Sequence, residues 1–179
     1  MQHTLTSTTP PTVLYQALKE VKKDLPLLLT LPWNSLFVDY HHPYVERLWR
    51  QWGSYRIYLH RILPCEPDQA LFHPHAAPSI MEIYEGTYAM DIGAGAGDDP
   101  PPVVSTLILP PGTIYSMPHP DGWHSVRPTH ATTMSLMLSG TPWSRKAPKP
   151  TKELGLLSID QGTRILDFFT AKYPRVPSR

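Results

Sequence analysis

The chain is poor in cysteine and in excess charge of either sign. Its single cysteine, Cys65, excludes an intramolecular disulfide and any metal site built from several thiolates. One cysteine also suits a reducing compartment, so we expect a cytoplasmic protein. The 16 Lys+Arg residues and 15 Asp+Glu residues give a net charge of +1 without a basic stripe, and we therefore expect no nucleic-acid partner.

Long apolar runs and long proline-free windows are scarce as well. Apolar runs such as 27–29 are too short to cross a bilayer, and the first residues lack the positive and apolar regions of a signal peptide. We therefore expect no membrane partner. The 22 prolines interrupt the chain too often for a helical bundle or a doubly wound α/β fold. A single β-rich domain with a few flanking helices remains, which suits 179 residues.

Helices are expected only toward the two ends of the chain. One amphipathic helix is predicted over 12–24 and ends before Pro26. A second helix is predicted over 43–52, because its apolar residues recur at helical spacing behind a proline and in front of a glycine. A last helix follows a linker rich in lysine and proline, with Ser158 or Asp160 as its N-cap.

Between these helices, short runs of apolar residues predict strands. In 54–60, Tyr55, Ile57 and Leu59 alternate with more polar residues, which is the two-residue period of a half-buried strand. About eight short antiparallel strands are typical of a small sandwich or barrel. Turns rich in proline and glycine separate the seven further strand-like runs, at 70–75, 79–84, 86–92, 103–109, 112–117, 122–127 and 132–138.

These patterns divide one structural domain into three parts. Residues 1–53 form a tail and two helices packed on the barrel, 54–142 form the β-barrel, and 143–179 form a linker and the C-terminal helix. A glycine cluster at 93–97 resembles a dinucleotide-binding loop. Aspartates and prolines follow at 98–102, where such a loop would begin a helix, so we interpret the cluster as a hairpin loop.

Histidine is abundant: nine are present, and six of them lie between His60 and His130. In the sequence His73-Pro74-His75, an extended chain directs both imidazoles to the same side. Pro74 supports this geometry because it disfavours a helical conformation at His73. Two neutral imidazoles suit iron, zinc, copper or nickel better than magnesium or calcium. The sequence therefore predicts half of a metal site.

The histidine pair and the turns after it resemble the cupin superfamily. The first cupin motif reads G-x5-H-x-H-x3-4-E-x6-G, and His73, His75 and Gly86 fit its spacing. The second motif, G-x5-P-x-G-x2-H-x3-N, is matched in part by 110–112. The resemblance covers about half of the chain, 55–140. It implies a mainly β fold, a cupin-type double-stranded β-helix (jelly-roll barrel) with flanking N-terminal and C-terminal α-helices.

Departures from these motifs indicate one branch of the superfamily. Ser79 stands where the first motif has its carboxylate ligand, and Tyr115 stands where the second motif has its histidine. The strand that carries His124 behind a glycine and a bulky residue resembles the three-histidine branch, typified by cysteine dioxygenase, in which no carboxylate binds iron. This resemblance implies His73, His75 and His124 as the metal ligands.

Two further residues are candidates near this site. Glu82 lies three positions beyond Ser79, so strict alternation places it on the opposite face of its strand. A bulge would rotate Glu82 inward and make it a metal ligand. His119 lies in a proline-rich loop and competes with His124 for the third ligand position, although we expect His119 to be a substrate-facing or an exposed loop residue instead.

Three neutral histidines leave a divalent metal with its full positive charge, which attracts an anionic substrate. The resemblance implies Fe(II) and a mononuclear dioxygenase-like oxidoreductase acting on a small anionic or thiol-bearing molecule, with zinc, nickel and manganese left open. A thiol dioxygenase needs a cation for its substrate carboxylate, and we expect Arg56, with Arg61 on the other face of the strand as the alternative. Tyr115, as a hydrogen-bond donor, and His119 complete the predicted catalytic residues.

A different class of function fits the same residues. The alternative is a non-catalytic or isomerase-type cupin that binds a sugar or a small acid in the same cavity, with a structural metal or none. Either function takes a small molecule as its partner. We also expect the chain to form a homodimer.

Overall fold

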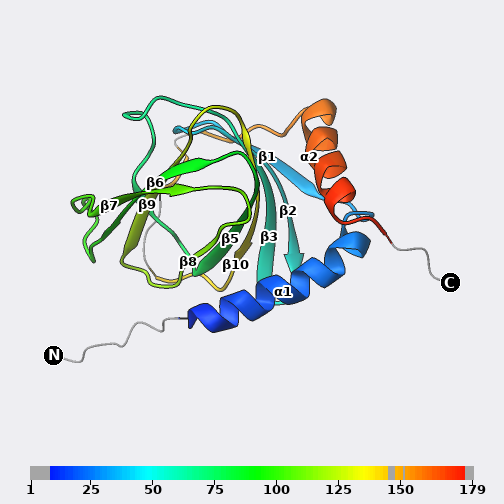
Figure 1. Cartoon of the computed structure of the whole chain (residues 1–179), viewed down its shortest axis with the longest axis horizontal. Helices are drawn as coiled ribbons and strands as arrows, with labels where there is room; N and C mark the ends of the chain where they lie inside the picture. The colour runs from blue at the N-terminus through cyan, green and yellow to red at the C-terminus, as the bar shows by residue number, and fades with distance from the viewer. Residues whose placement is uncertain (1–8, 145–147, 151, 176–179) are drawn as a thin grey trace.

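The architecture is a β-sandwich with one helix at each end of the chain (Figure 1). The structure is a computed structural model and describes residues 9–144, 148–150 and 152–175. The N-terminal helix is α1 (Pro11–Leu28), and the C-terminal helix is α2 (Ile159–Lys172). Ten strands lie between them: β1 (Asn34–Val38), β2 (Val45–Trp52), β3 (Tyr55–Ile62), β4 (His73–Pro74), β5 (Ser79–Glu85), β6 (Tyr88–Ala94), β7 (Ser105–Leu109), β8 (Ile114–Met117), β9 (Gly122–Pro128) and β10 (Thr133–Ser139).

The strands form two antiparallel sheets whose order is that of a jelly roll. One sheet has the order β1-β2-β3-β10-β5-β8, and the other has the order β4-β9-β6-β7. If the eight strands from β3 to β10 are renumbered 1 to 8 in chain order, the two sheets have the orders 1-8-3-6 and 2-7-4-5. Each step along the chain between β3 and β8 therefore crosses from one sheet to the other or turns at an edge. The predicted mainly β, cupin-type fold with flanking helices is therefore confirmed.

All eight strands predicted between 54 and 138 exist, but the predicted helix over 43–52 is wrong. This segment is strand β2, which pairs with β3 along its whole length, from Val45↔Ile62 to Trp52↔Tyr55, and with β1 over 45–49. Both faces of β2 are covered, because Val45 and Arg47 face the interior of the barrel whereas Leu48 packs under the helices. A strand buried on both sides loses the simple alternation, and its apolar residues then imitate helical spacing.

The two helices cover the outer face of the six-stranded sheet. Apolar residues of α1 and α2 form one core with β2, β3, β5 and β10, which includes Leu18, Leu48, Leu59 and Phe169. The helix α1 extends beyond the predicted 12–24, because Pro26 lies inside its last turn. The cap predicted at Ser158 is present as a capping box with Gln161, in which each side chain bonds the backbone N–H of the other residue.

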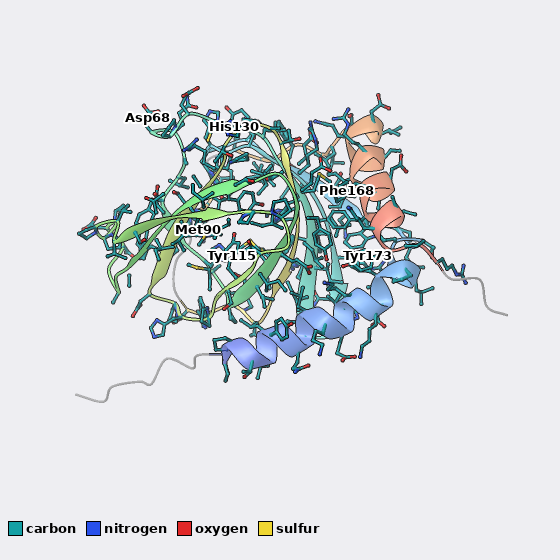
Figure 2. All side chains as sticks on the ribbon, in the orientation of Figure 1. Asp68, Met90, Tyr115, His130, Phe168 and Tyr173 are labelled. Atoms are coloured by element: carbon teal, nitrogen blue, oxygen red, sulfur yellow. The ribbon has the colours of Figure 1, made fainter. Side chains whose placement is uncertain are left out.

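The interior between the two sheets is a separate core. Buried residues of both sheets meet there, including Ile83, Tyr88 and Met90. Figure 2 shows Met90 and Tyr115 between the sheets, whereas Asp68 and His130 lie at the periphery. Neither helix of the described chain is both long and apolar enough to cross a membrane.

Candidate metal centre

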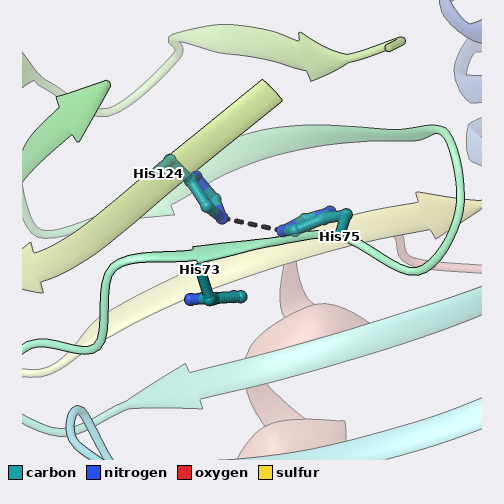
Figure 3. Close-up of side chains that lie close together, drawn as sticks. All are labelled: His73, His75 and His124. Atoms are coloured by element: carbon teal, nitrogen blue, oxygen red, sulfur yellow. Dashed lines mark hydrogen bonds between the residues drawn. The ribbon is translucent and has the colours of Figure 1, made fainter. Parts of the chain in front are cut away.

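Strands β4 and β9 bring the three predicted histidines together. His73 is directly opposite His124 in the antiparallel register of these strands, and His75 follows two residues after His73. One ring nitrogen of each histidine lies within 4.8 Å of those of the other two (Figure 3). This spacing is what three imidazoles need to share one metal ion.

Hydrogen bonds orient two of the three rings. The Nδ1 of His73 lies 2.9 Å from the carbonyl oxygen of Leu71. A carbonyl only accepts, so Nδ1 carries the proton and Nε2 keeps its lone pair. The Nδ1 of His75 lies 2.5 Å from the hydroxyl of the fully buried Ser79. When Nδ1 donates to this hydroxyl, Nε2 of His75 is likewise free to bind a metal.

The third histidine presents a polar atom with no partner. His124 is buried, and its Nδ1 has no hydrogen-bond partner among the described residues. Its Nε2 lies 2.7 Å from Nε2 of His75, and Figure 3 shows these two rings directed toward one another. Converging ring nitrogens of neutral imidazoles fit a divalent transition metal, so the donor set agrees with the predicted site.

Burial keeps all three histidines neutral at physiological pH. Loss of solvation lowers the pKa of His73 to about 4 and the pKa of His75 to about 3, and it holds the pKa of His124 well below its ordinary value. A hydrogen bond to the Leu71 carbonyl opposes this shift at His73 but is outweighed. Neutral imidazole is the form that binds a metal.

The three histidines line a cavity of about 440 Å³ inside the barrel. Much of its wall is apolar and is contributed by β1, β2, β3 and β10, for example by Val38, Ile62 and Met137. The segment 148–154 adds Pro148, Pro150 and Leu154. A concave site of this size and composition suits a small organic molecule.

Among the described residues, one charged side chain, that of Arg47, lines this cavity. Its Nε donates to Nε2 of His60 over 3.0 Å, and its guanidinium lies 4.9 Å from the centre of the Tyr58 ring. No carboxylate contacts Arg47 among the described residues. Burial lowers the pKa of Arg47, but a guanidinium stays protonated in proteins, so the cavity carries a positive charge that no acidic side chain of the described residues neutralises.

Sequence reasoning missed Arg47 because the segment around it was predicted to be a helix. Had 45–52 been recognised as a strand, its alternation with β3 would have placed Arg47 beside His60, its register partner. His41 was also missed: it lines the cavity, and its ring centre lies 5.8 Å from that of His73.

Two predicted catalytic residues lie outside the cavity wall. Arg56 is exposed at the start of β3, and its guanidinium stacks 4.6 Å from the ring of Trp49. His119 is exposed in the loop after β8, where its Nδ1 accepts a hydrogen bond from the backbone N–H of Asp121. Neither side chain therefore lines the cavity with the three histidines, because face and loop position alone did not reveal how far along the barrel each residue lies.

Tyr115 is close to the histidines but does not reach the cavity. Its ring centre lies 6.2 Å from that of His124. Its hydroxyl donates to the sulfur of Met81 over 3.1 Å, and Met81, not Tyr115, contributes to the cavity wall. The predicted hydrogen bond from Tyr115 to a substrate is therefore not available in this arrangement.

Glu82 does not face the three histidines. No bulge interrupts β5 between Ser79 and Glu82, so Ser79 faces the histidines and Glu82 faces outward. The Glu82 carboxylate accepts hydrogen bonds from Nζ of Lys22, at 2.7 and 2.8 Å, and from the hydroxyl of Tyr84 at 2.9 Å. The alternative cation, Arg61, also faces outward and pairs with Glu46 over 2.9 Å.

Comparisons with known proteins assign no family to the chain: no family model and no curated protein matches it. Hydroxypropylphosphonic acid epoxidase from S. wedmorenis aligns with 18% identity and a TM-score of 0.43 over 59% of this chain and 55% of that one. An Fe(II) form of HppE aligns with 20% identity and a TM-score of 0.44 over 60% of this chain and 55% of that one. Protein NMB1881 from Neisseria meningitidis aligns with 13% identity and a TM-score of 0.40 over 53% of this chain and 83% of that one.

The chain thus spans about half the length of the epoxidase it matches. Similarities this low carry no argument about activity, because one fold supports many functions. The description of the fold therefore rests on the strand order, and that of the site rests on the three histidines and the cavity.

Proposed function

We propose that the chain holds one divalent metal ion, Fe(II), through His73, His75 and His124 and oxidises a small anionic or thiol-bearing molecule with O₂. The observation that carries the proposal is the convergence of three neutral ring nitrogens in the wall of a cavity that contains one guanidinium. Three protein ligands leave coordination positions open for other molecules. Bound Fe(II) would supply redox chemistry and a Lewis-acidic centre at this place.

Within this function, Arg47 binds the anionic group of the substrate. The bond from its Nε to His60 leaves the two terminal nitrogens of the guanidinium for a carboxylate or a similar anion. Burial and the neighbouring guanidinium hold the pKa of His60 well below its ordinary value, so His60 stays neutral and can accept this bond. The apolar wall excludes water and thereby strengthens the interaction of Arg47 with an anion.

Metal analysis of protein expressed without an affinity tag tests the site. We expect about one equivalent of metal in the wild-type chain and loss of that metal in a His73→Ala/His124→Ala variant. A His119→Ala/His130→Ala variant is the matched control, because both of its histidines are exposed and lie outside the triad. Equal metal content in all three proteins would overturn the proposal.

Oxygen uptake tests the reaction class. Protein reconstituted with Fe(II) is expected to consume O₂ in the presence of at least one member of a panel of small thiols and carboxylates. In an Arg47→Met variant, the substrate concentration that gives half-maximal O₂ uptake should rise about tenfold or more, since a hydrogen bond to a charged group contributes about 1.5–3 kcal/mol. An Arg56→Met variant should behave as wild type. Binding of sugars or acids without any O₂ uptake would favour the non-catalytic or isomerase-type cupin.

A further inference from the structure

An unprotected sheet edge lies on the side of the barrel away from both helices (Figure 1). Strand β7 is the last strand of the four-stranded sheet and pairs only with β6, so one row of its backbone groups has no strand partner in the described chain. Natural proteins protect such edges with charges, prolines or bulges, or by covering them. Strand β7 contains no charged residue, no proline and no bulge along its length.

The other edges differ from β7. Strand β1 is partly covered by the segment before α2, because the backbone N–H of Phe37 donates to the carbonyl of Gly155. Strand β4 has 2 residues and β8 has 4, which leaves little edge to pair. Strand β7 has 5 residues, and all but the last are exposed. It is therefore the longest uncovered edge among the described strands.

Apolar side chains gather on this edge. Val103, Val104, Leu107 and Ile108 are 51%, 73%, 38% and 63% exposed. No other segment of six described residues carries as many exposed large apolar side chains. Contiguous apolar area of several hundred Å² on a protein surface typically marks an interaction site.

We propose that β7 pairs with β7 of a second copy of this chain and forms a homodimer with one continuous eight-stranded sheet. An antiparallel pair of identical edges is self-complementary under a twofold axis, so the same interface pairs the free backbone groups of β7 in both copies. The stretch 100–118 has no charged residue, so the two paired strands place no like charges opposite one another, and the acidic residues Asp98 and Asp99 lie in the adjoining loop. Prolines at 100–102 and 110–111 end the strand on both sides and limit the pairing to this short segment.

The size of the patch predicts the strength of the association. A stable interface buries about 800 Å² per partner. Four apolar side chains supply only part of that area, and the remainder must come from the backbone edge and the neighbouring hairpin loop. We therefore expect a dimer that dissociates at micromolar concentrations rather than an obligate one.

Sedimentation velocity over a range of concentrations tests the proposal. The wild-type mass should rise from 20.3 kDa toward twice that value as the concentration increases. A Val104→Lys/Ile108→Lys variant places charges on two exposed positions of the edge and should weaken self-association about tenfold or more. A Leu156→Lys/Ile159→Lys variant alters two residues that are 77% and 86% exposed elsewhere, and it should dimerise as wild type does.

Hydrogen exchange locates the contact. The backbone amides of β7 should exchange more slowly at high than at low concentration in the wild type, and this difference should vanish in the Val104→Lys/Ile108→Lys variant. A chain that stays monomeric at every concentration would overturn the proposal and leave the edge for a strand of another protein. A dimer that persists in this variant would overturn it as well. Metal content should be equal in all variants, because β7 contributes no ligand.

Discussion

At the residue scale, Ser79 shows how a single substitution changes a metal site without removing it. Where the cupin motif has a carboxylate ligand, this chain has a hydroxyl that lies 2.5 Å from Nδ1 of His75. Serine is too short and too weak a donor to replace the carboxylate in the metal shell. In this position it instead holds the ring of His75 and favours the tautomer with a free Nε2.

The role of Ser79 leads to a prediction about metal affinity. A Ser79→Ala variant should bind the metal about tenfold or more weakly, because the groups that orient metal-binding histidines typically contribute 10–100-fold. The measurement is a competition titration against a chelator of known affinity. Ser139→Ala is the matched control, since Ser139 is opposite Ser79 in β10 and lines the cavity without contacting the triad. Unchanged affinity in Ser79→Ala would contradict the assigned role.

Sequence reasoning found the three clustered histidines but not the cation in the cavity wall, for a physical reason. The histidines lie on chain segments whose conformation is set locally, by a proline between His73 and His75 and by a turn before His124. Arg47 is defined only by its cross-strand neighbours, Tyr58 and His60, and these contacts depend on how β2 pairs. A residue whose role depends on long-range pairing is lost when its element is misassigned.

At the scale of elements, strands that lie between clear turns were predictable, whereas β1 and β2 were not. Runs such as β5 and β10 lie between clear turns, and their predicted limits differ from the observed ones by one residue. Strand β1 was missed altogether, and β2 was taken for a helix, because its apolar residues recur at helical spacing between Pro43 and Gly53, which are typical of helix ends. Their burial follows from tertiary packing and leaves no regular period in the sequence.

The contact between α1 and β5 is an element-scale feature that can be tested. The pair Lys22–Glu82 joins the two elements, with 31% and 12% of the side chains exposed. Burial lowers the pKa of Lys22, but the hydrogen bond and the charge of Glu82 outweigh it and raise the pKa above its ordinary 10.5. The stabilisation that the charge of Lys22 contributes is thus complete at neutral pH and is lost as the pH rises above 10.5.

Replacing Glu82 separates its structural role from the ligand role first expected of it. A Glu82→Gln variant should lower the free energy of unfolding by about 1 kcal/mol in urea titrations at pH 7, since the pair is only partly buried. Its metal content should stay that of the wild type. Glu20→Gln, which breaks the exposed pair with Lys23, should leave stability unchanged. Loss of metal in Glu82→Gln would show that the carboxylate reaches the metal after all.

At the scale of the whole molecule, the barrel brings several histidines out of water around one cavity. His60, His73, His75 and His124 all have pKa values lowered by burial. In the unfolded chain each would titrate near 6.5. Below that pH the unfolded state binds more protons than the folded state, so the metal-free protein should lose stability as the pH falls from about 6.5 toward the folded values.

This acid sensitivity can be isolated by comparing two proteins. The free energy of unfolding of the metal-free wild type should fall more between pH 7 and pH 5 than that of a His73→Ala/His75→Ala variant. We expect this extra loss to be of the order of 2 kcal/mol for each of the two histidines, because one pKa unit corresponds to about 1.4 kcal/mol. Urea titrations at both pH values measure the difference, and the effects of carboxylates cancel because both proteins contain them. An equal loss in the two proteins would mean that these histidines take up protons in the folded barrel. Added metal should raise the free energy of unfolding at pH 7 in the wild type alone. Only the wild type has the complete triad, and a ligand that binds the folded state stabilises it.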